Sequence, residues 1–351
     1  MRLSACLLPL FLLLLGTCQT SRAQNAYTAN PGLVYATVDG KDLVLDLYVP
    51  TAASPTFPPV VLWIHGGAWS HGTRQDNITN ALNVLAGKGI ALATLEYRLS
   101  NAAKWPAQLH DCKGAVRWLR ANAAKYALDP ARVGAWGESA GAHLAAMLGT
   151  AHRVGPFKAE GKDMDLEGNV GGNLLQLSSV QAVCDYYGPT DFLRSNSGGA
   201  FNYDVKAATF PPAVLIGGIV PDHPELCASA SPLTFVGKED PPFLILHGSS
   251  DAEVQPMQSR WLDSALTKAG VSSTLQVFQG AGHGGAVFWS AATAKTVSEF
   301  FTARLLPGPD AIRGARFVAP GAPGADEVAR DAAGRARDGG KRPALPVFRL
   351  H

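Results

Sequence analysis

The most constraining feature of the chain is the run Gly137-Glu138-Ser139-Ala140-Gly141, which separates a strand-like segment from a helix-like one. The segment before it, 132–136, is short and mostly apolar, and 142–148 is rich in Ala and Leu. A serine at such a junction adopts a strained backbone conformation and projects its hydroxyl from the sheet edge. Glycines two residues to either side remove Cβ atoms that would collide in so sharp a turn. The run therefore predicts a strand–turn–helix unit that presents Ser139 as a nucleophile.

Strand-like and helical segments alternate along the chain. The first two strands resemble a hairpin around Asp39-Gly40, and the later ones are almost wholly apolar, as strands covered on both faces are. The alternation predicts an α/β fold with an eight-stranded, mostly parallel sheet and an antiparallel N-terminal edge. The expected strands are 34–38, 43–49, 60–65, 90–97, 132–136, 180–186, 243–247 and 274–278, and the expected helices are 77–86, 107–124, 140–148, 256–269 and 287–305.

Two stretches, 151–177 and 191–240, break this alternation. They are rich in Gly, Pro, Ser and Asn and show little periodicity. Long excursions after the carboxyl ends of strands gather at the substrate end of such a sheet. We therefore expect a small, loop-rich cap there; solvated loops with no substrate role are the alternative.

The N-terminus has the pattern of a signal peptide over residues 1–23. Arg2 precedes the apolar run 7–15, and Ser21 and Ala23 are the small residues that a signal peptidase reads. The apolar run is too short for a stable membrane span. We expect export, to the periplasm or the extracellular space, after cleavage near Ala23. Acylation of Cys18 in a lipoprotein is the less favoured alternative.

The rest of the chain divides into a folded domain over 24–306 and a tail over 307–351. The tail is rich in Ala, Gly, Pro and Arg, so it cannot bury enough apolar surface to order, and we expect disorder. The net charge of +2 gives no reason to expect nucleic acid or an anionic membrane as a partner. Three cysteines remain after the signal, which suggests one bridge and one buried thiol. We expect Cys184 to pair with Cys227 and Cys112 to pack in a helix.

A serine hydroxyl needs a base to accept its proton as it attacks. His283 stands in a glycine-rich turn between the last strand and the last helix, from which its ring can reach the sheet edge. Asp251, just past the strand 243–247, is the expected acid that orients this histidine, with Glu253 as the rival. The chain order Ser139, Asp251, His283 is the order expected for a nucleophile in this type of sheet.

The attacked carbonyl develops a negative oxygen that preorganised N–H groups must stabilise. The strand 60–65 ends in His65-Gly66-Gly67-Ala68-Trp69, and we expect the amides of Gly67 and Ala68, with that of Ala140, to be the donors. Trp69 is a candidate wall of the substrate pocket, with core packing as the equal alternative. The other histidines lack metal-site spacing, so we expect no metal and no cofactor.

The two motifs together resemble the α/β-hydrolase superfamily and, within it, the hormone-sensitive-lipase and bacterial esterase branch. The segments 96–99, 128–133, 187–191 and 241–248 are similar to secreted bacterial esterases grouped with acetyl-xylan and feruloyl esterases. The resemblance extends from about residue 34 to residue 305. The chain departs from many relatives at Ala68, where they carry a third glycine.

The resemblance implies serine-dependent hydrolysis through an acyl-enzyme. It favours an exported carboxylic-ester hydrolase acting on short-chain or polysaccharide-linked acyl esters. An amide-directed enzyme on the same scaffold, such as an exopeptidase or arylformamidase, is the first alternative. A catalytically silent binding protein with this fold is the second, and the intact set of Ser139, Asp251 and His283 argues against it.

Overall fold

The computed structural model describes residues 26–54, 56–196 and 204–306. The expected signal peptide (1–23), the alternative lipid site at Cys18 and the tail (307–351) all lie outside these residues. Within the described ranges, no helix combines the length and the apolar character that crossing a membrane requires.

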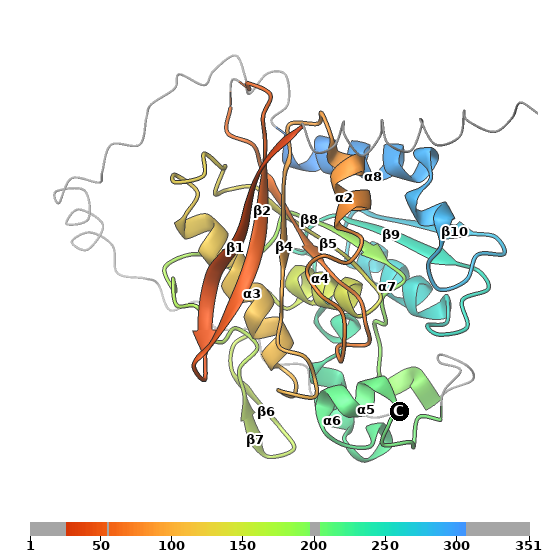
Figure 1. Ribbon diagram of the computed structural model, residues 1–351. Coiled ribbons are helices and arrows are strands. Elements are labelled where there is room, and N and C mark those ends of the chain that lie inside the picture. The colour runs from red at the N-terminus through yellow and green to blue at the C-terminus, as the bar shows by residue number, and fades with distance from the viewer. Residues whose placement is uncertain (1–25, 55, 197–203, 307–351) are drawn as a thin grey trace, which may run out of the picture. The chain divides into compact units, whose positions relative to one another are not determined.

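A single eight-stranded sheet forms the centre of the fold, with the strand order β1-β2-β4-β3-β5-β8-β9-β10 (Figure 1). β2 pairs antiparallel with both β1 and β4, and every other pairing is parallel. This confirms the mixed, mostly parallel sheet predicted from the sequence. The strands are β1 Tyr27–Val38, β2 Lys41–Pro50, β3 Val60–Ile64, β4 Ala91–Leu95, β5 Val133–Glu138, β8 Ala182–Tyr186, β9 Phe243–Gly248 and β10 Ser273–Phe278.

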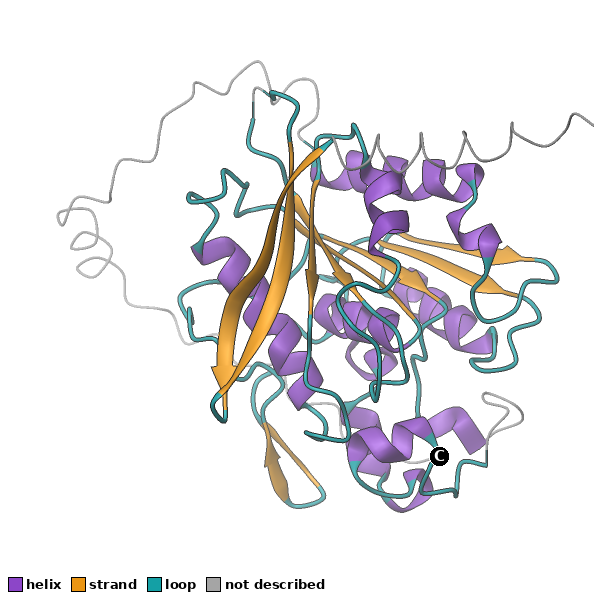
Figure 2. Ribbon diagram, in the orientation of Figure 1, coloured by secondary structure: helices purple, strands orange, loops and turns teal. Residues whose placement is uncertain are grey.

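Helices cover both faces of the sheet, because its inner strands are apolar on both sides (Figure 2). In β3, Val60, Leu62 and Ile64 join the core cluster under one set of helices, whereas Val61 and Trp63 join the cluster on the other face. The first face is covered by α3 Ala107–Ala121, α4 Ala140–Thr150 and α7 Met257–Lys268, and the second by α2 Ile78–Leu85 and α8 Ala291–Leu305.

Two local predictions have different outcomes. Asp39 and Gly40 both have positive φ, of 50° and 73°, and form the expected turn between β1 and β2. The expected single helix 287–305 is instead a short 3-10 turn, η4 Ala286–Trp289, followed by α8. Ser290 separates them because its extended backbone ends the first element and its hydroxyl accepts a hydrogen bond from Thr293 N at the start of the second.

The stretches that broke the alternation form short elements of their own. Residues 151–177 contain the two-stranded hairpin β6 Phe157–Ala159 and β7 Lys162–Met164, which sequence reasoning missed. Within 191–240, the structure describes a cap of short helices, and Figure 1 places α5 and α6 together beyond the end of the sheet. These cap elements are η1 Leu193–Asn196, α5 Pro211–Ile216, η2 Val220–Asp222, α6 Pro224–Ser229 and η3 Pro232–Phe235.

The expected bridge between Cys184 and Cys227 is wrong, because Cys112, Cys184 and Cys227 are all free and buried. Cys184 lies in β8 and packs in the cluster under α2 and α8. Cys227 lies in α6 of the cap and packs in the other cluster, where its thiol donates to Val220 O at 3.5 Å. The two side chains therefore belong to opposite sides of the sheet. Burial raises the pKa of Cys227 to about 12, so this thiol stays protonated and packs as a small apolar group.

Candidate active site

Ser139 occupies a sharp turn between β5 and α4. Its backbone has φ 51° and ψ −120°, and its amide donates to Tyr186 O at 2.8 Å. A Cβ on Gly137 would lie 2.4 Å from the carbonyl carbon of Gly141, and one on Gly141 would lie 2.0 Å from Ile64 O. Both glycines are therefore required by close backbone contact. The hydroxyl of Ser139 does not cap α4, which leaves it available to a partner across the sheet edge.

The structure brings Ser139, His283 and Asp251 together. His283 Nδ1 lies 2.7 Å from Asp251 Oδ2, and His283 Nε2 lies 2.9 Å from Ser139 Oγ. A carboxylate only accepts, so Nδ1 carries the proton and donates to Asp251, while Nε2 accepts from the serine hydroxyl. This is the tautomer that a general base for Ser139 requires.

Asp251 is held as a carboxylate by several donors. Its Oδ1 accepts the amides of Glu253 and Val254 at 2.8 and 2.9 Å. Its Oδ2 accepts from His283 and lies 3.2 Å from His247 Nε2. Burial alone would raise the pKa of Asp251, but the hydrogen bonds from His247 and His283 are stronger and lower it well below its usual value.

The rival acid, Glu253, has a different position. Its side chain is 59% exposed, and its Oε2 lies 3.9 Å from His283 Nε2, the nitrogen that faces Ser139. It makes no contact of hydrogen-bond length with the nitrogen that needs an orienting acid. The geometry therefore assigns the partner of His283 Nδ1 to Asp251.

His247 is a residue of the site that sequence reasoning missed. It is the buried, penultimate residue of β9. Its Nδ1 lies 2.6 Å from Ser259 Oγ, and its Nε2 lies 2.8 Å from Val254 O. Through Val254 and Asp251 it fixes the loop that carries the acid. Its position near the end of a strand, four residues before Asp251, could have indicated a role in the site. The sequence alone does not show which way its ring turns.

The loop after β3 has an unusual backbone. Gly67, Ala68 and Trp69 all have positive φ, of 103°, 49° and 57°. A Cβ on Gly67 would lie 2.1 Å from His71 O, so only glycine fits there. Within the described residues, no acceptor takes the amide protons of Gly67 and Ala68, or that of Ala140 at the first turn of α4. We call residues 66–69 the oxyanion loop, for the role expected of them.

The buried His65 and the half-buried Glu138 brace the turns around Ser139. The ring of His65 stacks on that of Tyr97 at 4.3 Å, and its Nδ1 contacts Gly66 O at 2.7 Å. The carboxylate of Glu138 accepts from Asn77 Nδ2 at 2.8 Å and from Tyr187 Oη at 3.0 Å. Burial raises the pKa of Glu138 against the effect of these two bonds. The Tyr187 ring also meets His283 edge-on at 4.6 Å, so it supports the imidazole as well.

A small pocket of about 50 Å³ opens beside Ser139 and His283. Trp69 lines it and is itself only 2% exposed, so its ring is both a pocket wall and part of the core. The cap contributes an aromatic ring and two prolines, which makes the pocket mainly apolar. Its lining comprises Ala68, Trp69, Ser139, Ala140, Pro189, Phe210, Pro211, Pro212, Glu253, Val254 and His283.

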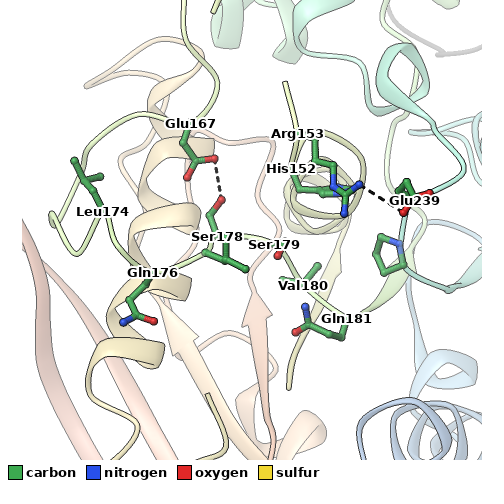
Figure 3. A pocket seen from close by; sticks show the side chains of 12 residues that line it. His152, Arg153, Glu167, Leu174, Gln176, Ser178, Ser179, Val180, Gln181 and Glu239 are labelled. Carbon is green, nitrogen blue, oxygen red and sulfur yellow. Dashed lines mark hydrogen bonds and ion pairs between the residues drawn. The ribbon is translucent and has the colours of Figure 1, made fainter. Parts of the chain in front are cut away.

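A larger hollow, of about 620 Å³, lies elsewhere (Figure 3). Gln181 and Pro241, which line it, precede β8 and β9, so it lies at the amino ends of the parallel strands. Ligands of open α/β sheets bind at the carboxyl ends, where Ser139 stands. Size is therefore a poor guide here, and the smaller pocket is the candidate site. In the described part of the chain, no cluster of His, Cys, Asp and Glu is arranged to hold a metal ion.

The parallel sheet, the serine turn and the Ser139–His283–Asp251 arrangement define an α/β-hydrolase fold with its characteristic site. The chain belongs to the BD-FAE family, whose model matches residues 45–266.

Solved structures and curated relatives agree with this family. A truncated form of a carbohydrate esterase from gut microbiota is 32% identical with a TM-score of 0.72, covering 80% of this chain and 98% of that one. A bifunctional GH43-CE from Bacteroides eggerthii is 35% identical with a TM-score of 0.70, covering 80% of this chain and 38% of that one. Esterase LipC of Mycobacterium tuberculosis is 33% identical over 66% of this chain and 54% of LipC. The chain spans about half the length of the curated relatives it matches.

Proposed function

We propose that this protein is a serine carboxylesterase that removes short acyl groups from their esters. The observation that carries the proposal is the position of the His283 ring, 2.9 Å from Ser139 Oγ and 2.7 Å from Asp251 Oδ2. A serine within reach of a base whose tautomer is fixed by a buried carboxylate is suited to acyl transfer. The pocket beside Ser139 supplies room for the acyl group.

In the proposed reaction, Ser139 Oγ attacks the ester carbonyl while its proton passes to His283 Nε2. Asp251 stabilises the imidazolium, and the amides of Gly67, Ala68 and Ala140 stabilise the oxyanion. The proton then goes to the departing alcohol, and the serine ester remains. Water attacks that ester with His283 again as base, the acid leaves, and the serine recovers its proton.

The pocket favours small acyl groups. Its volume of about 50 Å³ exceeds the roughly 15 Å³ that one water needs and suits a short acyl group better than a long chain. Two relatives bear carbohydrate-esterase names, so acyl groups on a polysaccharide are the substrates we favour. A panel of p-nitrophenyl esters of increasing chain length, with acetylated and feruloylated xylan, tests this directly. A matched ester and amide pair separates the amide-directed alternative.

The nucleophile is tested with a fluorophosphonate probe, which labels an activated serine. The wild type should be labelled and Ser139→Ala should not, while both give the same thermal unfolding profile. Labelling of Ser139→Ala at the wild-type rate would place the nucleophile elsewhere.

The acid is tested with a matched pair of variants. Asp251→Asn keeps the size of the side chain but favours the wrong tautomer of His283, so kcat should fall by about 10³–10⁴-fold. Glu253→Gln should change kcat by less than about tenfold, because Glu253 lies at the pocket mouth and is more than half exposed. Equal losses in the two variants would contradict the assignment.

We also propose that the protein is exported, on the strength of the signal pattern over 1–23. N-terminal sequencing of the protein recovered from outside the cytoplasm should begin at Gln24. A lipid-modified N-terminus at Cys18 would support the lipoprotein alternative instead.

A further inference from the structure

His143 is a buried histidine that the proposed chemistry does not use. It lies four residues after Ser139, one turn along α4, and is 0% exposed. Its ring stacks on Phe192 with centroids 5.2 Å apart and meets the Trp69 indole edge-on at 5.1 Å. It therefore packs between the oxyanion loop and the start of the cap.

Both ring nitrogens of His143 are engaged, and by different parts of the molecule. Trp69 Nε1 donates to His143 Nδ1 at 3.1 Å. Nδ1 is therefore the unprotonated nitrogen, and Nε2 donates to Ala230 O at 2.7 Å. Burial lowers the pKa of His143 to about 4, so the ring is neutral near pH 7 and can keep both bonds.

On the side of the oxyanion loop, the bond holds a strained backbone. Ala68 and Trp69 lie in the left-handed region without being glycine, which costs about 1 kcal/mol or more for each. Such a conformation persists only where neighbouring contacts enforce it. Trp69 is fixed by its indole bond to His143 and by Trp69 O, which accepts from Ser100 N at 2.7 Å.

On the side of the cap, His143 belongs to a row of anchors along residues 229–231. Trp105 Nε1 donates to Ser229 Oγ at 3.0 Å, His143 donates to Ala230 O, and Phe192 N donates to Ser231 Oγ at 3.0 Å. Trp105 N also donates to Leu215 O in α5 at 2.9 Å. The same helix supplies the prolines that line the pocket. These hydrogen bonds therefore fix the position of the cap over the acyl pocket.

We propose that His143 is a positioning residue that couples the oxyanion loop to the cap through its two ring nitrogens. This inference rests on the proposed esterase function for its kinetic consequences. The hydrogen bond from Trp69 to Nδ1 keeps the amides of the oxyanion loop at the place where the oxyanion forms. Its loss should therefore lower kcat. The bond at Nε2 holds the cap against the pocket, so it acts on KM and on the choice of acyl group.

Three substitutions separate the two bonds. Asn places a side-chain oxygen near the position of Nδ1, whereas Gln places an amide nitrogen near that of Nε2. His143→Asn therefore keeps the acceptor for Trp69 and loses the cap bond, and His143→Gln does the reverse. Trp69→Phe removes the indole donor while keeping an aromatic ring. His152→Gln, just beyond the far end of α4, is the matched control for replacing a histidine.

The kinetic test uses p-nitrophenyl acetate and butyrate, with active sites counted by fluorophosphonate titration. We expect His143→Gln to lower kcat at least tenfold with little change in KM. Trp69→Phe, which also alters the pocket wall, should lower kcat by a similar factor, and the double variant should lose no more kcat than either alone. His143→Asn should raise KM and alter the acetate-to-butyrate ratio. If kcat stays within twofold of wild type in both His143→Gln and Trp69→Phe, the inference is wrong.

Hydrogen exchange gives a readout that needs no substrate. The amides of Ser70 and His71, which donate to Gly67 O, and that of Ser100, which donates to Trp69 O, should exchange faster in His143→Gln. The hydrogen-bonded amides of 214–217 and 230–231 should exchange faster in His143→Asn. Faster exchange in all these segments in every variant would show a merely structural role and overturn the coupling. If wild type hydrolyses none of the esters while exchange follows the expected pattern, the proposed function fails and the coupling stands. If the His143 variants do not fold, Trp69→Phe carries the same test for the oxyanion loop.

Discussion

The two turns that flank the site hold strained backbones by opposite means. At the serine turn, glycines clear the space around Ser139, and a Cβ on Gly141 would come within 2.0 Å of Ile64 O. In the oxyanion loop, Ala68 and Trp69 keep their side chains at positive φ, and contacts of the Trp69 ring hold them there. The first turn depends on the absence of side-chain atoms, which the glycines of its own five-residue motif provide. The second depends on partners that are distant in the sequence.

Gly141→Ala tests, with the largest expected effect, whether the serine turn depends on the missing Cβ atom. The added methyl would overlap the backbone of β3, which lies at the centre of the sheet and cannot shift without loss of strand pairing. We expect the free energy of unfolding to fall by about 3 kcal/mol or more, a large part of the roughly 5–15 kcal/mol that stabilises an ordinary domain. Denaturant titration measures this. Gly282→Ala is the control, because a Cβ there meets nothing within 4 Å; equal losses in both variants would contradict the argument.

A smaller effect is expected behind the serine turn, at Asp185 in β8. It is fully buried, its Oδ1 accepts Gly188 N at 2.8 Å, and its Oδ2 has no hydrogen-bond partner among the described residues. Burial raises the pKa of this carboxyl from 3.8 to about 6. Ionisation therefore opposes folding: the contribution of Asp185 to stability is fully present below pH 3.8 and is lost as the pH rises through about 6.

Asp185→Asn removes that ionisation and keeps an oxygen for Gly188. A pKa difference of about two units corresponds to about 3 kcal/mol, so the variant should gain up to that much over wild type at pH 8. The gain should shrink to near zero by pH 4. Unfolding in urea at several pH values measures it. A difference that does not change with pH would mean that Asp185 is not the group that titrates.

The contrast between the turns also explains what the sequence could predict. The serine turn, the mostly parallel sheet and the residues Asp251 and His283 follow from local motifs and from their place after particular strands. The helices of the expected cap did not, because α5 and α6 have only six residues each and show no periodicity. The contact between His143 and Ala230 joins residues 87 positions apart, and no local pattern reports it.

The cysteines show the same limit. An odd count in a chain expected to be exported suggested a bridge between Cys184 and Cys227, but counting carries no information on which face of the sheet each side chain occupies. The structure separates them into two core clusters. Likewise, the sequence does not predict the contact between His247 and Asp251, which depends on how the loop after β9 folds back.

The smallest expected effect is that of Ala68→Gly. Glycine would relieve the strain at φ 49°, worth about 1 kcal/mol, but it also adds a similar amount of conformational entropy to the unfolded chain. The free energy of unfolding should therefore change by less than about 1 kcal/mol, as measured by denaturant titration. Ala68→Val is the matched opposite, because a β-branched residue is strongly disfavoured at this φ and should destabilise the protein by more. If Ala68→Gly raised the free energy of unfolding by more than about 2 kcal/mol, the loop would store more strain than its φ values indicate. The contacts of Trp69 would then offset a correspondingly larger strain energy.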